Sequence, residues 1–575
     1  MALKMTGAQA LVRVWLGEQV RHVYGIVGGK LGPLLQAISE QSQLRFIGTR
    51  HEGVAPMMAA AAFAGTGQLA VAIAEMGPGG LNLISGLGVA FNNNLPLLAI
   101  TTNQHRAAAY PHSGMFMDLD SVAVSRPITK WNAVVHDARR MPELARRALR
   151  EALSGRPGPV HLDVPQDVLG QVCEFADDEF DLVPAQYRPI GRVRPDAQAV
   201  KQAVEMLRAA RRPLIVAGGG VVASEAARQV RALAESLNAP VIPTQMALGV
   251  VPTSSPHFIG HGGLIAGAPV KEAFEQADVI LSVGCRWSSW MWDEMGPLAR
   301  RGHRSIAINI DPSALGQPVI HQVAMQADAG AALDELLVAM SGVREAGTEE
   351  GWLARLKGAR ERYEQAFAAG AAEAGPVIHP AALAREIAAA LPADALAVYD
   401  GGHTTFWSND LTPAHEVRSR FHEPGMSHLG FGLPYALALK AARPERPVVL
   451  ITGDGSFGFT MNELDTARRY GLAVVTIIHN NESWGIIRSG QRNALDFELG
   501  TSLEGSDYAA IARGFGCHGE RVDALEAVAP AVRRAFASGL PAVIDCRTRF
   551  VPHPAAPMFG SMNRYGFAAL VNPAA

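Results

Sequence analysis

Short apolar runs alternate with helix-like stretches along most of the chain. In residues 1–180, apolar runs fall at 22–28, 44–49, 69–75 and 95–102, and helix-like stretches fall at 7–20, 31–40, 54–67 and 81–93. Runs of this length predict buried strands. Their alternation with helices predicts a parallel sheet with helices on both faces.

The same alternation returns in two further blocks, at residues 196–342 and 376–550. A proline-rich linker at 180–195 separates the first block from the second, and a charged helix within 344–374 connects the second to the third. We therefore predict an α/β protein of three doubly wound parallel-sheet domains. Residues 551–575 show no clear periodicity and are a candidate lid over an active site or a neighbouring subunit.

Composition and charge exclude several classes of protein. The chain has 575 residues, 48% of them hydrophobic and 18% charged, and its net charge of −3 comes from interspersed signs. It has neither a basic face for nucleic acid nor a polybasic patch for a membrane surface. Its uncharged stretches are interrupted by Gly, Pro and Asn, and its N-terminus lacks the features of a signal peptide. The four dispersed cysteines are expected to be reduced, buried thiols of a cytoplasmic protein.

Residues suited to binding a ligand or a metal ion concentrate at 448–485. A strand-like run at 448–452 ends in Gly453-Asp454-Gly455, a helix is predicted from Thr460 to Tyr470, and a second run at 472–478 ends in Asn480-Asn481. In open α/β sheets, ligands bind at the carboxyl ends of the strands. Asp454 and the amide oxygen of Asn481 are hard ligands suited to Mg²⁺ or Ca²⁺. The alternative is a plain Asp-Gly turn followed by an Asn-rich loop.

This segment resembles the metal–diphosphate signature of thiamine diphosphate (ThDP) enzymes, in which Gly-Asp-Gly precedes Asn-Asn across a strand–helix–strand unit. The resemblance implies that Asp454, Asn481 and the backbone carbonyl of Ser483 hold Mg²⁺ against the diphosphate of ThDP. It also places Trp484 and Gly485 beside the cofactor.

A glutamate follows the second predicted strand. In RHEGVAPMMAAAAFAG, Glu52 stands just before an alanine-rich helix. A glutamate there can simply interact favourably with the dipole of the helix that follows. The segment also resembles the pyrimidine-domain motif of ThDP enzymes. That resemblance implies that the Glu52 carboxyl group hydrogen-bonds N1′ of the aminopyrimidine and favours the 4′-imino tautomer, which generates the C2 ylid.

Three further segments resemble parts of a ThDP site. AEMGPGGLN (74–82) resembles the Gly-Pro-Gly turn near the pyrimidine, EPGMSHLGFG (423–432) resembles the segment that props the bent cofactor, and VYDGGHTTFW (398–407) resembles a phosphate cradle. With the Gly-Asp-Gly turn, they imply the cofactor-binding residues Gly77, Gly79, Gly402, His403, Thr404, Ser427, Leu429, Gly455 and Ser456. Leu429 stands at the apolar wedge, where many family members have Met. His403 is equally compatible with a substrate-contacting or a solvent-facing histidine.

The same resemblance has a consequence for assembly. In this family, Glu52 of one subunit meets Asp454 of its partner. The chain is therefore expected to form a homodimer or homotetramer with active sites at the subunit interface.

Local sequence around the reacting centre suggests the reaction. RPITKW (126–131) and NNESWG (480–485) followed by Gln491 look like benzaldehyde lyase and the 2-hydroxyacyl-CoA lyases. A carbon–carbon lyase or carboligase of this kind, acting on a carbonyl or acyl-CoA substrate, is our first expectation. YGIVGGKLGPLLQAI resembles acetolactate synthases, although Met117 stands where those enzymes usually have Gln. An acetolactate synthase-type carboligase that decarboxylates 2-oxo acids is the alternative, and a non-catalytic ThDP-fold protein is an alternative of another class.

The candidate substrate residues are Lys30, Phe116, Met117, Gln491 and Glu498. Lys30 stands where benzaldehyde lyase has a histidine. Its charge could meet a carboxylate, sulfonate or phosphate, or it could simply face solvent. Glu498 and the C-terminal tail would suit a lid over a large substrate.

A glycine triplet at residues 218–220 marks the central block. Together with Arg286 and Asp311, it occupies the place where related enzymes bind FAD or the ADP part of CoA. Many Rossmann-like loops carry such a triplet without binding a nucleotide. A nucleotide moiety is therefore a further candidate ligand, beside ThDP and Mg²⁺.

Overall fold

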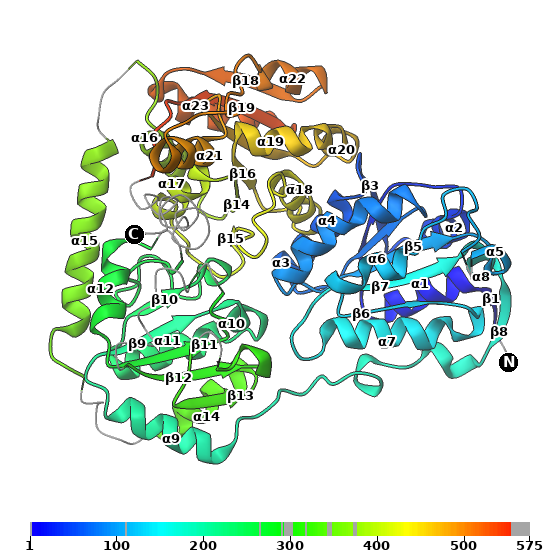
Figure 1. Ribbon diagram of the computed structural model, residues 1–575, viewed down its shortest axis with the longest axis horizontal. Helices are drawn as coiled ribbons and strands as arrows, with labels where there is room; N and C mark the ends of the chain where they lie inside the picture. Colours follow the sequence, from blue (N-terminus) through cyan, green and yellow to red (C-terminus); the bar gives the residue numbers. More distant parts are fainter. Residues whose placement is uncertain are drawn as a thin grey trace. The chain divides into compact units, whose positions relative to one another are not determined.

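The computed structural model (Figure 1) describes residues 3–109, 112–263, 266–288, 291, 303–316, 319–341, 348–371 and 376–553. All but the first three residues of the candidate lid at 551–575 lie outside these ranges. Three parallel sheets are present, as the alternating pattern predicted. The four cysteines are buried thiols, also as predicted. Among the described residues, no helix is both long and apolar enough to cross a membrane.

The first block contains a six-stranded sheet with the order β3-β2-β4-β5-β7-β6. Its strands are β2 (His22–Gly25), β3 (Arg45–Gly48), β4 (Val71–Ala74), β5 (Leu98–Asn103), β6 (Trp131–Val134) and β7 (Val160–Pro165). Its helices are α1 (Gly7–Gly17), α2 (Gly32–Ser39), α3 (Val54–Thr66), α4 (Pro78–Asn92), α5 (Arg106–Ala109), α6 (Ser121–Ser125), α7 (Met141–Leu153) and α8 (Gln166–Gly170). Two short strands that the sequence did not indicate form an antiparallel pair. They are β1 (Leu3–Thr6), which precedes the sheet in the chain, and β8 (Val172–Phe175), which follows it.

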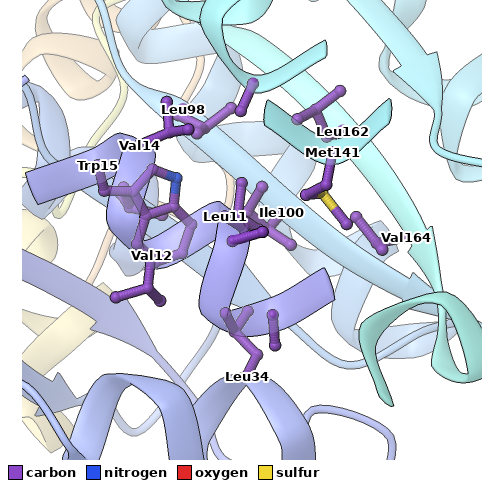
Figure 2. Packing of buried hydrophobic residues seen from close by; sticks show 14 of the residues in the cluster. Leu11, Val12, Val14, Trp15, Leu34, Leu98, Ile100, Met141, Leu162 and Val164 are labelled. Atoms are coloured by element: carbon purple, nitrogen blue, oxygen red, sulfur yellow. The ribbon is translucent and has the colours of Figure 1, made fainter. Parts of the chain in front are cut away.

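The apolar face of α1 accounts for its position. Thr6 caps the helix by accepting a hydrogen bond from the amide of Gln9, and Leu11 and Trp15 are fully buried. Figure 2 shows these side chains gathered with Leu98 of β5 and Leu162 of β7. Burial of each large apolar side chain contributes about 1.5–3 kcal/mol, so this cluster fixes α1 against the sheet.

The central block contains a five-stranded sheet with the order β10-β9-β11-β12-β13. Its strands are β9 (Pro213–Ala217), β10 (Val241–Pro243), β11 (Val279–Val283), β12 (Arg304–Asn309) and β13 (Val323–Gln326). Its helices are α9 (Ala197–Arg208), α10 (Gly219–Ala223), α11 (Ala227–Leu237), α12 (Ala268–Gln276) and α14 (Ala329–Met340), followed by the connecting helix α15 (Trp352–Ala371). Ile215 and Ala217 of β9 join one hydrophobic core, and Leu214 and Val216 join another. Alternate residues of one strand therefore serve two cores, as expected of a doubly wound sheet.

The third block contains a six-stranded sheet with the order β15-β14-β16-β17-β19-β18. Its strands are β14 (Leu396–Asp400), β15 (Arg420–Phe421), β16 (Val448–Gly453), β17 (Val474–Asn480), β18 (His518–Val522) and β19 (Ala542–Arg547). Its helices are α16 (Pro380–Ala390), α17 (His403–Leu411), α18 (Gly432–Ala442), α19 (Asp454–Thr460), α20 (Leu464–Arg469), α21 (Gly485–Gly490), α22 (Tyr508–Gly514) and α23 (Val528–Ala537). When the strands of each outer block are numbered one to six along the chain, both six-stranded sheets have the strand order 2-1-3-4-6-5. The two outer domains therefore share one topology.

The predicted helix from Thr460 to Tyr470 is wrong in its boundaries. The structure begins a helix at Asp454 itself, and a 3₁₀ turn (Met461–Glu463) separates α19 from α20. The Asp454 carboxylate in the first turn favours helix initiation, and the two glycines of the motif do not prevent it.

The chain forms two compact units. The first comprises Met1–Gly191, Gly425–Arg446 and Thr460–Val474, and the second comprises Arg192–Pro424, Pro447–Phe459 and Val475–Ala575. The third block therefore contributes α18 and α20 to the first unit. There α18 packs closely on α3, because a Cβ atom at Gly65 would lie 2.4 Å from Leu439 Cδ2.

Candidate active site

Asp454 and Asn481 meet at one edge of the third sheet. Asp454 follows β16 and Asn481 follows β17, and these strands are neighbours. The amide of Ser483 donates to Asp454 Oδ2 (3.1 Å) and to Asn481 Oδ1 (3.1 Å). The Ser483 hydroxyl donates to the same Asn481 oxygen at 2.9 Å. The three metal ligands implied by the sequence thus lie together, where the segments after β16 and β17 meet.

The Asp454 carboxyl group lacks a cationic partner in the part of the chain that the structure describes. Burial raises its pKa to about 7, although backbone amides of Gly455 and Ser483 act in the opposite direction. The described residues contain no cluster of three or more His, Cys, Asp or Glu side chains that could hold a metal. A site built on one carboxylate, one amide and one carbonyl suits Mg²⁺, which usually takes its other ligands from phosphate and water. The donor set therefore fits a magnesium–diphosphate group.

Glycines allow close packing around these metal-ligand residues. A Cβ atom at Gly455 would lie 2.5 Å from the Trp484 ring, and one at Gly402 would lie 2.6 Å from Ile486 Cδ1. A Cβ atom at Gly485 would lie 3.1 Å from Asn481 Nδ2 and 3.4 Å from His403 Cδ2. These residues come from three separate segments and pack closely in one small region, where there is little or no room for a side chain larger than that of glycine.

Two more predicted cradle residues lie in the same region. A Cβ atom at Gly453 would lie 3.3 Å from Thr404 Oγ1, and one at Gly401 would lie 3.0 Å from Ser456 Oγ. Backbone amides at the beginning of a helix suit a phosphate group, and α17 begins at His403, immediately after Gly402. The cradle therefore fits the diphosphate of ThDP.

His403 is buried, so the solvent-facing alternative is wrong. Its side chain is 6% exposed, and its Nε2 lies 2.9 Å from Ser489 Oγ. Burial, with the nearby His553, lowers the pKa of His403 to about 4. The imidazole is therefore neutral at physiological pH and can serve as a hydrogen-bonding group beside the cradle.

Glu52 lies in the first unit. One of its carboxylate oxygens accepts a hydrogen bond from a neighbouring side chain, and the other is available to a ligand. Asn82 Nδ2 donates to Glu52 Oε2 at 3.0 Å. A Cβ atom at Gly79 would be 3.4 Å from Oε1, and no hydrogen bond from a described residue reaches that oxygen. The arrangement fits a carboxyl group that hydrogen-bonds a ring nitrogen of a cofactor. Asn82 was not predicted, although it closes the Gly-Pro-Gly segment that was.

A second carboxylate, Glu463, holds the loop that carries Glu52. The amide of Arg50 donates to Glu463 Oε1 (2.9 Å) and Oε2 (3.2 Å), and the Thr466 hydroxyl donates at 2.6 Å. Glu463 is fully buried, and burial raises its pKa to about 7. No local sequence signal identified Glu463, because its partner Arg50 lies 413 positions away in the chain.

The Gly-Pro-Gly turn packs against the candidate substrate loop. Gly77 has φ of 61°, and a Cβ atom there would lie 2.7 Å from the Met117 carbonyl oxygen. Met117 itself has φ of 63°, a conformation uncommon for a non-glycine residue. Phe116 is 78% exposed, and its carbonyl accepts a hydrogen bond from Gln104. Gly77, Phe116 and Met117 therefore lie together.

Glu75 ties Lys30 to the same turn. It accepts hydrogen bonds from the amides of Lys30 (2.8 Å) and Met76 (3.2 Å) and from the Thr102 hydroxyl (2.9 Å). A Cβ atom at Gly79 would lie within ordinary contact of both Glu75 Cβ and Glu52 Oε1. Lys30 is thus held on a loop near Glu52, a connection that the sequence did not reveal.

Ser427 and Leu429 also belong to the first unit, although the sequence placed them in the third block. Ser427 has φ of 52°, and the preceding Gly425 donates its amide to Asn93 Oδ1 at 3.1 Å. The first unit therefore holds the residues implied to contact the pyrimidine, and the second holds those implied to contact the metal and diphosphate.

The polar groups of Gln491 and Glu498 are used within their own segment. Gln491 donates to the Leu499 carbonyl and accepts from its amide. Glu498 pairs with Arg488 (2.8 Å) and Arg492 (2.5 Å). Hydrogen bonding, led by that from Thr501, lowers the pKa of Glu498. These contacts explain both side chains as loop-closing residues, and their assignment to substrate stays a prediction.

The central glycine triplet has a packing explanation. A Cβ atom at Gly218 would lie 2.3 Å from the Gly284 carbonyl oxygen, and the amide of Gly220 donates to that oxygen at 3.1 Å. Asp311 accepts a hydrogen bond from the amide of Ser313 at the start of a 3₁₀ turn. The loops after β9 and β11 thus need small residues to approach each other. No observation supports a nucleotide there among the described residues.

Family models match all three blocks. The model for the thiamine pyrophosphate enzyme N-terminal TPP binding domain matches residues 5–124, that for the central domain matches 200–336, and that for the C-terminal TPP binding domain matches 400–546.

Several curated relatives match nearly the whole chain. A probable 2-ketoarginine decarboxylase of Pseudomonas aeruginosa is 33% identical, covering 94% of each chain. The acetolactate synthase large subunit of Corynebacterium glutamicum is 29% identical, covering 94% of this chain and 86% of the relative. The acetolactate synthase isozyme 1 large subunit of Escherichia coli is 30% identical, with coverages of 89% and 88%. The chain belongs to the thiamine pyrophosphate enzyme family.

Proposed function

We propose that this enzyme decarboxylates a 2-oxo acid with ThDP and Mg²⁺ and transfers the resulting acyl unit to a second carbonyl compound. The observation that carries the proposal is the near full-length similarity to acetolactate synthases and a probable 2-ketoarginine decarboxylase. 2-Ketoarginine is a 2-oxo acid, and acetolactate is an acetyl unit joined to the carbonyl carbon of pyruvate. The comparisons do not support our first expectation of a 2-hydroxyacyl-CoA lyase or benzaldehyde lyase, nor an acyl-CoA substrate.

Each part of the candidate site has a role in this reaction. ThDP, when bound, supplies a nucleophilic carbon that adds to the substrate carbonyl and then accepts the electron pair as CO₂ leaves. The free Oε1 of Glu52 is available to hydrogen-bond the pyrimidine nitrogen, while Asn82 fixes the other oxygen. Asp454, Asn481 and the Ser483 carbonyl would hold Mg²⁺, and the glycine-lined cradle would hold the diphosphate.

Lys30 and the loop at Phe116 and Met117 are proposed to contact the substrate. Glu75 accepts a hydrogen bond from the Lys30 amide, and the Gly77 turn packs closely against the carbonyl of Met117. An apolar Met117 and an exposed Phe116 offer hydrophobic surface for the substrate side chain. Lys30 offers a positive charge for an anionic group.

We also propose that two copies of the chain complete each active site. The pyrimidine and diphosphate residues belong to different compact units, and in the related enzymes that the sequence resembles these residues come from different subunits. A homodimer would then be the smallest active species.

Product analysis tests the reaction. Purified enzyme loaded with ThDP and Mg²⁺ is incubated separately with pyruvate, 2-oxobutyrate and 2-ketoarginine, and CO₂ release and organic products are measured by mass spectrometry. We expect CO₂ from at least one acid together with an acyl-transfer product, whereas CO₂ with an aldehyde alone would support the decarboxylation and contradict the transfer. Condensation of formyl-CoA with a ketone, without CO₂ release from any 2-oxo acid, would contradict the proposal.

A further inference from the structure

A buried aspartate outside the motifs connects both sides of the candidate metal site. Asp545 lies in β19 and is 1% exposed. One carboxylate oxygen, Oδ1, accepts a hydrogen bond from Asn480 Nδ2 at 2.9 Å, and the other, Oδ2, accepts one from the amide of Tyr508 at 3.2 Å. Asp545 therefore ties Asn480 of β17 to Tyr508 of α22, and the segments next to these two residues also meet in a β-bridge between Ser483 and Ser502.

The Asn480 side shapes the loop that follows β17. Asn480 Oδ1 accepts the amide of Glu482 at 3.2 Å, and Glu482 adopts φ of 53°. This left-handed residue turns the chain so that the next amide, that of Ser483, reaches both Asp454 and Asn481. A non-glycine residue in that conformation costs about 1–3 kcal/mol and needs support from its surroundings. The Asp545–Asn480–Glu482 chain of hydrogen bonds provides that support.

The Tyr508 side reaches the other metal ligand. With its amide held by Asp545, Tyr508 donates its hydroxyl to the backbone carbonyl of Asp454 at 3.2 Å. Tyr508 also packs edge-on against Phe457 of α19, with ring centroids 5.6 Å apart. These contacts hold the first turn of the helix that begins at Asp454.

We propose that Asp545 is a positioning residue that aligns Asp454 and Asn481 for magnesium. This inference rests on the metal site assigned under the proposed function. Residues that orient metal ligands without touching the metal typically change metal affinity about 10- to 100-fold when they are replaced. Asp545 has the geometry for this role because each of its oxygens controls one side of the site.

Asn480 cannot compensate for the loss of the carboxylate. In an Asp545→Asn variant, the new amide nitrogen would face either Asn480 Nδ2 or the Tyr508 amide, both of which are donors. Rotation of the Asn480 amide by half a turn would restore one bond and break the bond from Glu482. One arm of the alignment is therefore lost in either arrangement.

The test measures metal affinity independently of turnover. Apoenzyme with saturating ThDP is titrated with Mn²⁺, and free Mn²⁺ is followed by electron paramagnetic resonance. We expect Asp545→Asn to weaken Mn²⁺ binding about 10-fold or more. Tyr508→Phe and Asn480→Ala, which leave the charge of Asp545 in place, should each weaken it several-fold.

Val543→Ala is the matched control, because Val543 is fully buried in the same strand and takes no part in the polar chain. It should lower the melting temperature while leaving Mn²⁺ affinity within about twofold of wild type. Equal Mn²⁺ affinity in wild type and Asp545→Asn would contradict the positioning role of Asp545 but not the metal site itself. The same holds if Val543→Ala loses as much Mn²⁺ affinity as Asp545→Asn. If Asp545→Asn does not fold, Tyr508→Phe and Asn480→Ala decide in the same way. Wild-type enzyme that takes up no Mn²⁺ with ThDP would overturn the metal assignment itself.

Discussion

The carboxylate of Glu463 accepts both of its shortest backbone hydrogen bonds from the amide of Arg50, which is 413 positions away in the chain. Arg50 lies in the loop after β3 and stands two residues before Glu52. A segment next to the Gly-Asp-Gly motif thus fixes the loop of the candidate catalytic acid within the first unit. The same carboxylate is fully buried, so holding it in the ionised form has an energetic cost.

Glu463 should make stability depend on pH. Its pKa is raised to about 7 in the folded chain, whereas an ordinary glutamate titrates at 4.5. Between these values the folded chain retains a proton that the unfolded chain releases, so stability is greatest at low pH and falls as pH rises to about 7. In the Glu463→Gln variant this loss of stability, up to about 3 kcal/mol in the free energy of unfolding, should disappear.

Melting temperatures from about pH 5 to about pH 8 measure this effect. The Glu463→Gln protein should gain stability relative to wild type as pH rises across that interval. Glu40→Gln is the control, since Glu40 is exposed, and it should show a constant difference from wild type. A constant difference for Glu463→Gln as well would contradict the prediction.

Glu52→Gln should abolish most activity while leaving cofactor binding intact. Glutamine can still accept the hydrogen bond from Asn82, but it cannot exchange a proton with a ring nitrogen. Proton transfer by a positioned side chain typically contributes about 10²- to 10⁴-fold, so we expect a fall in kcat of that size. Steady-state kinetics and calorimetric titration with ThDP and Mg²⁺ separate the two effects. Unchanged turnover would remove Glu52 from the catalytic site.

Mixing two inactive variants should restore activity if subunits share active sites. Glu52→Gln leaves Asp454 intact, and Asp454→Asn leaves Glu52 intact. After subunit exchange, half of the dimers are mixed, and each mixed dimer contains one site with both native residues. Activity should therefore recover to about a quarter of wild type. A site formed within one chain would give no recovery, and a mixture of two Glu52→Gln preparations is the matched control.

Asp410 should stabilise the second unit in a pH-dependent way. Its oxygens lie 2.7 Å from His261 Nε2, 2.7 Å from the Tyr363 hydroxyl and 3.2 Å from His553 Nε2. Burial alone would raise the pKa of Asp410, but hydrogen bonds from His261 and His553 outweigh it and hold that pKa below its ordinary value. Removing one member of such a buried group costs about 3–5 kcal/mol, so Asp410→Asn should lower the melting temperature clearly at neutral pH.

The sign of this dependence is opposite to that of Glu463. A carboxyl group with a lowered pKa contributes its full stabilisation above its ordinary pKa of 3.8, and loses it as pH falls further. The difference between wild type and Asp410→Asn should therefore persist from neutral pH to about pH 5 and shrink in stronger acid. Asp334→Asn, at an exposed position of α14, should differ little from wild type throughout. A difference that grows on acidification would contradict this account.

Much of the candidate site could be predicted because its residues follow strands directly. Glu52 follows β3, Gly77 follows β4, Gly402 follows β14 and Asp454 follows β16. Parallel strands present their carboxyl ends at one edge, so an apolar run that ends in glycine or an acid indicates a site without further information. The glycine triplet at 218–220 also follows an apolar run and so also indicated a binding site. There the glycines have another explanation, because close packing against Gly284 requires small residues.

The supporting carboxylates could not be predicted in this way. Glu463 lies in a short 3₁₀ turn, Glu75 precedes a glycine turn, and Asp545 lies within a buried strand. Each looks locally like an ordinary acid. Their roles arise from hydrogen bonds to Arg50, Lys30 and Asn480, and none of these partners lies within the same local segment.

The sequence by itself determined the alternation of helices and strands in the three blocks, the three sheets and the family, because hydrophobic period and glycine turns act over a few neighbouring residues. Only the tertiary structure decided that α18 and α20 join the first unit and that β19 lies beside β17, with Asp545 hydrogen-bonded to Asn480. Strand order and helix docking depend on contacts between distant segments. Their free energy comes from burial and hydrogen bonding that no short stretch of sequence contains.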